Sequence, residues 1–161
     1  MSAQLALARL GVDCPEEVMP CRSEAHKVSS PVTAHGFNFD HFVERDGERF
    51  AGYHFIVDLW GASGLDDLDL VDQAMRSAAV IAGATLLRVD LHHFTPNGGI
   101  SGVAILAESH ISIHTWPERA YAAVDVFMCG DARPQEAVEA LRRAFQAERI
   151  DLIEHRRGRL G

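Results

Sequence analysis

Three or four consecutive segments with the pattern of β-strands lie between two segments with the pattern of amphipathic helices, and this order limits the folds open to the chain. The first helix pattern carries one apolar stripe over residues 68–82 and follows a capping aspartate, Asp66 or Asp67. The second covers residues 131–146, with Pro134 in its first turn.

The strand-like segments are rich in β-branched and aromatic residues and are bounded by turn residues. They cover residues 52–60, 84–94, 101–107, 109–115, 121–129 and 150–155. The order strand, helix, three or four strands, helix, strand predicts an α+β two-layer sandwich with the helices on one face of a largely antiparallel sheet. A sheet with one uncovered face is also suited to dimerisation.

The chain has 161 residues, which suits one domain with a hydrophobic core of its own. Residues 1–51 differ from the rest because Pro15, Pro20, Pro31 and a polar run interrupt them. We therefore expect residues 1–51 to form an N-terminal extension of unreadable role, with a short helix and loops, and residues 52–161 to form the functional domain.

Charge and composition exclude several classes of protein. The net charge of −8 argues against nucleic-acid binding, which needs clustered Lys and Arg. No apolar run approaches the roughly 20 residues of a membrane-spanning helix, and no convincing secretory signal begins the chain. The three cysteines include no Cys-x-x-Cys pair, which indicates neither a disulfide framework nor a thiolate zinc site. The expected location is a reducing cytoplasm.

Polar residues interrupt an otherwise strand-like stretch, AESHISIHTW, at residues 107–116. His110 and His114 are four positions apart, which on a helix would suit a metal site. The alternating Ile111 and Ile113 predict a strand instead, where such residues lie ~13 Å apart. We therefore expect ordinary strand histidines and no metal.

A nucleophile activated by a base is a second possibility for the same stretch. Ser109 and His114 would face opposite sides of a straight strand, ~16 Å apart, whereas a base must lie within hydrogen-bond reach of the nucleophile. Contact would need a bend near residues 108–110, or approach from another strand or subunit. Taken singly, Ser109 is a turn serine and Cys129 a small buried hydrophobe.

A longer pattern adds a resemblance. The segment GGISGVAILAESHISIHTWPERAYAAVDVFMCG, residues 98–130, resembles the processing and catalytic segment of the prokaryotic S-adenosylmethionine decarboxylases. The similarity extends more weakly to Gly52-x-His54 upstream and to Glu154-His155-x-x-Gly158-Arg159 downstream. Members of that family are pyruvoyl enzymes that cut their own chain at a Glu-Ser bond.

The resemblance implies self-cleavage between Glu108 and Ser109. Ser109 Oγ would attack the Glu108 carbonyl, with Ser101 assisting this step. His114 would then remove the Cα proton of residue 109, so that β-elimination releases residues 1–108. The remaining chain, 109–161, would begin with a covalent pyruvoyl group derived from Ser109.

For the mature enzyme, the resemblance implies that the pyruvoyl carbonyl forms a Schiff base with the substrate amine and acts as the electron sink for decarboxylation. Cys129 matches the proton donor. Glu118, Phe94 and Trp116 match substrate-binding residues, with Phe94 suited to stacking on adenine or the sulfonium. The family also implies a homodimer with pockets at its interface.

The expected function is therefore a self-processing decarboxylase of S-adenosylmethionine that supplies the aminopropyl donor for spermidine synthesis. Three alternatives stay open. The same pyruvoyl chemistry could act on arginine or ornithine, or the chain could be a relative that does not cleave itself and serves as a binding or regulatory partner. A metal hydrolase using the histidines is the most distant of them.

Overall fold

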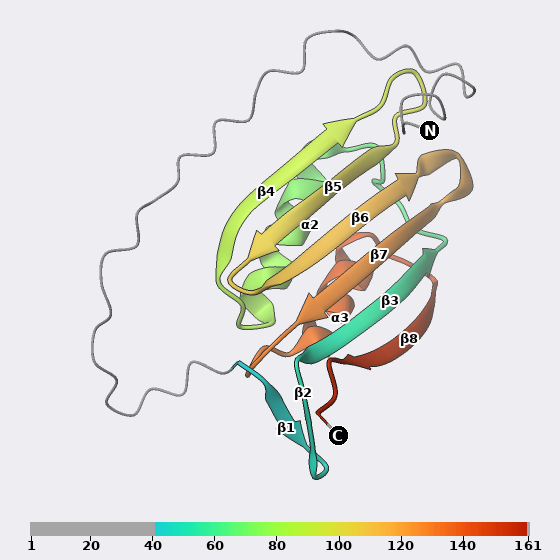
Figure 1. Ribbon diagram of the computed structural model, residues 1–161. Coiled ribbons are helices and arrows are strands. Elements are labelled where there is room, and N and C mark those ends of the chain that lie inside the picture. Colours follow the sequence, from blue (N-terminus) through green and yellow to red (C-terminus); the bar gives the residue numbers. More distant parts are fainter. Residues whose placement is uncertain (1–40, 161) are drawn as a thin grey trace, which may run out of the picture. The chain divides into compact units, whose positions relative to one another are not determined.

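The computed structural model of the protein describes residues 41–160 (Figure 1). Two helices and eight strands are the principal elements of this part of the chain. They are β1 (Val43–Arg45), β2 (Glu48–Phe50), β3 (Gly52–Trp60), α2 (Leu68–Ile81), β4 (Leu86–His93), β5 (Ile100–Leu106), β6 (Ser109–Trp116), β7 (Tyr121–Met128), α3 (Pro134–Ala144) and β8 (Arg149–Arg157). A 3-10 turn, η2 (Pro117–Arg119), joins β6 to β7.

Six strands form one sheet in the order β4-β5-β6-β7-β3-β8, and each neighbouring pair is antiparallel. Figure 1 shows α2 and α3 on the same face of this sheet, which leaves its other face open. The predicted α+β two-layer sandwich is therefore confirmed. The segment at 109–115 is a full strand, so four strands separate the two helices.

The core lies between the sheet and the two helices. Alternate residues of the central strands point into it, including Phe55 of β3, Ile111 of β6 and Val124 of β7. Met75 of α2 and Leu141 of α3 meet them from the helical layer and are at most 1% exposed. Each such side chain contributes about 1.5–3 kcal/mol when it leaves water, and this burial decides which face of each strand points inward.

The helix ends follow from local chemistry. Asp67 caps α2 by accepting a 3.0 Å hydrogen bond from the Leu70 amide, so Asp67 rather than Asp66 is the capping residue. Gly83 follows the helix with φ 76°, a left-handed conformation that suits glycine. Pro134 occupies the first turn of α3, as predicted. Neither helix of residues 41–160 is long and apolar enough to span a membrane.

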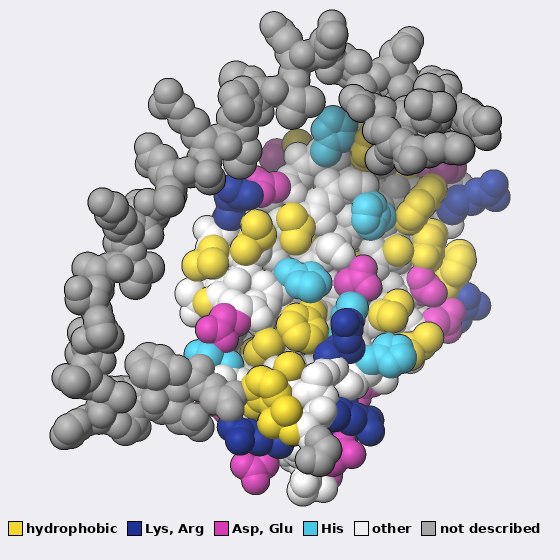
Figure 2. Space-filling view, viewed as in Figure 1, with side chains coloured by type: hydrophobic (Ala, Val, Ile, Leu, Met, Phe, Trp, Pro, Cys, Tyr) yellow, Lys and Arg dark blue, Asp and Glu magenta, His cyan; other side chains and the backbone are white. Residues whose placement is uncertain are grey.

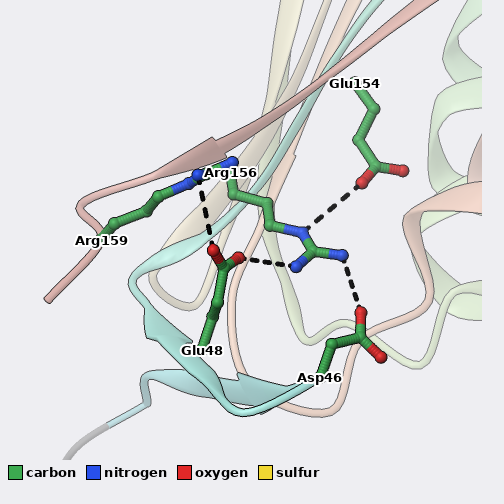
Figure 3. A network of polar contacts seen from close by, with 5 residues as sticks. All are labelled: Asp46, Glu48, Glu154, Arg156 and Arg159. Carbon is green, nitrogen blue, oxygen red and sulfur yellow. Dashed lines mark hydrogen bonds and ion pairs between the residues drawn. The ribbon is translucent and has the colours of Figure 1, made fainter. Parts of the chain in front are cut away.

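The hairpin of β1 and β2 comes before Gly52, the expected start of the domain, yet it belongs to the same folded unit. Phe50 at its end is fully buried. Arg156 of β8 bonds Glu48 at 2.7 Å and Asp46 at 2.9 Å, which ties the hairpin to the edge of the sheet (Figure 3). Residues 1–40, with the short helix expected there, lie outside the described residues.

Candidate active site

A two-residue turn joins β5 to β6 at the predicted cleavage bond. Leu106 and Ser109 are paired across the strands, so Ala107 and Glu108 alone make the turn. Glu108 has φ 61°, in the left-handed region. For a residue other than glycine this conformation carries about 1–3 kcal/mol of strain, and such strain is concentrated at functional sites.

Cys129 contacts both sides of the Glu108–Ser109 bond. Its thiol donates a 3.2 Å hydrogen bond to the Glu108 carbonyl oxygen, and its backbone amide donates one of 3.2 Å to Ser109 Oγ. Gly52 packs so closely here that a Cβ at this position would lie 3.2 Å from the Cys129 sulfur. The turn at Glu108, the Ser109 hydroxyl and the Cys129 thiol therefore lie together.

The surroundings of Cys129 favour the protonated thiol. Burial raises the pKa of the Cys129 thiol above its usual value, because a thiolate loses solvation there. The hydrogen bond with Ser109 lowers this pKa, and the negative charge of Glu108 raises it. The balance leaves a thiol that can donate a hydrogen bond or a proton.

The other predicted site residues gather at the opposite end of the sheet. Ser101 of β5 and His114 of β6 are cross-strand partners, and Ser101 Oγ lies 2.7 Å from His114 Nδ1. They line a hollow of about 210 Å³ together with Phe94, Trp116 and Glu118. Phe94 and Trp116 are 47% and 41% exposed, which leaves their rings accessible to a ligand.

Within one chain, Ser109 and His114 do not meet. The strand β6 runs without interruption from Ser109 to Trp116, so the bend that would unite them is not present. Five strand positions correspond to about 16 Å. Ser109 also shares the inward-facing side of β6 with Ile111, whereas His114 points to the open face. Ser101, bonded to His114, belongs to the same distant end.

Sequence reasoning missed a polar group on the open face of the sheet. Arg157 bonds His54 Nδ1 at 2.9 Å, His54 Nε2 lies 3.4 Å from the Asp125 carboxylate, and Ser112 donates to that carboxylate at 3.1 Å. Burial lowers the pKa of His110, which lies beside these residues, and the electrostatic interaction with His54 lowers it further. The signal was the presence of polar residues among the alternate positions that face away from the core on four strands: His54 of β3, His110 and Ser112 of β6, Asp125 of β7 and Arg157 of β8.

This open face mixes apolar and titratable side chains. Figure 2 shows hydrophobic and histidine side chains interspersed over the sheet. Ile56 and Ile153 are 40% and 57% exposed there, and His54 Nε2 is buried without a hydrogen-bond partner. In residues 41–160, no three His, Cys, Asp or Glu side chains are grouped as metal ligands would be.

Comparison with known proteins decides the family. A family model described as S-adenosylmethionine decarboxylase matches residues 53–158. The chain belongs to this family. The S-adenosylmethionine decarboxylase proenzyme of Thermomicrobium roseum is 46% identical over 108 residues, which are 66% of this chain and 93% of that protein. That of Methanococcus vannielii is 44% identical over 110 residues, 66% of this chain and 89% of that protein.

A solved structure of the S-adenosylmethionine decarboxylase family has the same fold. The crystal structure of the adenosylmethionine decarboxylase from Aquifex aeolicus superimposes with a TM-score of 0.64 at 34% sequence identity. The superposition covers 70% of this chain and 94% of that one. The family expected from the motif at residues 98–130 is therefore confirmed, and the hairpin of β1 and β2 precedes the matched region.

Proposed function

We propose that the chain is a self-processing S-adenosylmethionine decarboxylase that cuts its own Glu108–Ser109 bond to make a pyruvoyl group. The observation that carries this proposal is the strained turn at Glu108, with the Cys129 thiol on the carbonyl and the Cys129 amide on Ser109 Oγ. The relatives named above are called S-adenosylmethionine decarboxylase proenzymes, which supports this substrate over arginine or ornithine.

Cleavage begins with attack of Ser109 Oγ on the Glu108 carbonyl carbon. The carbonyl oxygen becomes negative, and the Cys129 thiol already donates to it at 3.2 Å, as an oxyanion donor must. Collapse breaks the C–N bond and leaves Glu108 as an ester on Ser109. Loss of the Cα proton of residue 109 then expels Glu108 as a carboxylate. The dehydroalanine takes up water and releases ammonia, which leaves the pyruvoyl group on the chain 109–161.

The residues around the bond fit a pyruvoyl group and its reaction. Such a group supplies the electron-withdrawing carbonyl that permits loss of carbon dioxide from an amino acid. Cys129 lies against residue 109, and its raised pKa keeps the thiol protonated until a proton is needed. Phe94, Trp116 and Glu118 would hold the substrate, the rings by stacking and the carboxylate by accepting hydroxyl hydrogen bonds.

The two ends of the sheet become one site if two chains pair. One end carries Glu108, Ser109 and Cys129, and the other carries Ser101 and His114, about 16 Å away. A twofold axis through the open face would place each end against the opposite end of the partner. The apolar and histidine side chains on that face support a homodimer, in which His114 of one chain removes the proton from residue 109 of the other.

Intact mass spectrometry of the purified protein tests the self-cleavage. The expected species are chains of residues 1–108 and 109–161, the second beginning with a pyruvoyl group. The Ser109→Ala variant should stay full length because it lacks both nucleophile and leaving oxygen. A wild-type chain that also stays full length would refute the proposal and favour the relative that does not cleave itself.

Release of labelled carbon dioxide tests the substrate. S-adenosylmethionine, arginine and ornithine are offered in parallel to the cleaved protein, with Ser109→Ala as the control. Turnover of S-adenosylmethionine alone is expected. Turnover of arginine or ornithine in its place would move the assignment to that alternative.

A further inference from the structure

His41 lies beside the cleavage bond although it precedes the region that the family model matches. Its Nε2 is 3.4 Å from Oε1 of Glu108, and its backbone oxygen accepts a 2.9 Å hydrogen bond from the Gly130 amide. Gly130 follows Cys129, whose thiol bonds the carbonyl of the same Glu108. Two adjoining segments therefore hold Glu108, one at its side chain and one at its carbonyl.

The hairpin that follows His41 fixes its place. β1 begins two residues later at Val43, and β2 ends at the fully buried Phe50. Arg156 binds Glu48 and Asp46 of the hairpin (Figure 3). Its guanidinium carbon also lies 5.3 Å from the centre of the Phe50 ring. These contacts hold the hairpin against β8 and the core independently of His41.

The charge of Glu108 matters because the reaction creates a second negative charge on the same residue. Attack by Ser109 makes the Glu108 carbonyl oxygen negative, and the side-chain carboxylate opposes this like charge. A positive charge beside the carboxylate, such as that of a protonated imidazole at His41, offsets that repulsion. Both partners of this ion pair are 58% exposed, so its effect is modest.

We propose that His41 is a positioning residue for self-cleavage, which acts through the Glu108 side chain. The inference rests on the proposed self-processing function. It assigns a role in cleavage to the segment before the matched domain, and that role ends once the bond is cut. Turnover by the mature enzyme therefore does not depend on the charge of His41.

The rate of cleavage of newly synthesised full-length chains tests the role. Wild type, His41→Gln, His41→Lys and the control His93→Gln are followed by intact mass in the same buffer. His93 is an exposed histidine at the end of β4. His41→Gln should cleave about two- to fivefold more slowly, whereas His41→Lys, which keeps the charge, and His93→Gln should cleave at the wild-type rate.

A double-mutant cycle separates this role from a general effect on folding. In the Glu108→Gln background, His41→Gln should have no further effect, because the carboxylate through which His41 acts is gone. Equal cleavage of His41→Gln and wild type would overturn the inference, as would equal slowing in both backgrounds or a failure of His41→Lys to restore the rate. A wild-type chain that does not cleave would overturn the proposed function and this inference together.

Discussion

Cleavage of one chain should need His114 of a second chain. The perturbation is a pair of variants, Ser109→Ala and His114→Ala, prepared separately and together. Ser109→Ala keeps the base but has no bond that it can cut. His114→Ala keeps the cleavable bond but lacks the base. Neither should cleave by itself.

The structure determines how much cleavage is expected within a single chain. Ser109 and His114 are separated by about 16 Å along a continuous strand, whereas a proton transfer needs about 2.6–3.2 Å between heavy atoms. A chain cannot close that gap without breaking β6, whose pairing with β5 and β7 holds it extended. Cleavage within one chain is therefore expected to be undetectable.

The assay is intact mass after the two variants are produced together in equal amounts. Random pairing places about half of the His114→Ala chains in mixed dimers, so about half of them should be cut. The mass of the fragment 109–161 shows which chain was cut, because only a fragment from a His114→Ala chain has alanine in place of His114. A Ser109→Ala/His114→Ala double variant, mixed with His114→Ala, is the matched control and should give no fragment.

Two outcomes would refute the shared site. His114→Ala chains that are cut to the wild-type extent without a partner would show that His114 is not the base. Mixed dimers that form, as shown by co-purification through a tag on one variant, but remain uncut would show that the two ends of the sheet do not meet across chains.

Three further predictions follow from the contacts. Cys129→Ala should slow self-cleavage about tenfold, because the Glu108 carbonyl loses a hydrogen-bond donor, although a weak one. The fraction of this variant that is cleaved should have lost turnover, measured as release of labelled carbon dioxide. Ile111→Ala should lower the free energy of unfolding by about 2–5 kcal/mol in urea denaturation, since Ile111 is fully buried. Burial and a 2.6 Å hydrogen bond to Asp58 raise the pKa of Tyr121 from 10.0 to about 12. Wild type should therefore be more stable than Tyr121→Phe below pH 10, and this difference in stability should disappear as the pH rises through about 12. Thermal unfolding of both proteins over this pH range measures the difference.

The spacing of apolar residues was sufficient to locate the helices and the strands of the main sheet. Helical and strand periods differ, and each element has one buried face, so the pattern of Ile111 and Ile113 in β6 determines which side points inward. The hairpin before Gly52 was not predicted. Its strands have three residues each, too few to show a periodic pattern, and Phe50 is the only one of these residues that is fully buried.

Residue types and their spacing did not identify the chemistry by themselves, because Ser109 taken singly predicts a turn serine and Cys129 a small buried hydrophobe. The resemblance over residues 98–130 indicated the family, which the comparisons confirmed. The same resemblance implied the roles proposed for Ser109 as nucleophile and for Cys129 as proton donor.

Only the tertiary structure decided which of these residues meet. Antiparallel pairing brings Cys129 to Glu108 and Ser101 to His114, partners that lie 21 and 13 positions apart in the chain. The same pairing keeps β6 extended and so separates Ser109 from His114, which are only five positions apart. Distance in a sheet depends on strand register rather than on sequence separation, and for this reason the sequence left open whether a bend brings Ser109 to His114. The continuous strand β6 shows that no such bend is present.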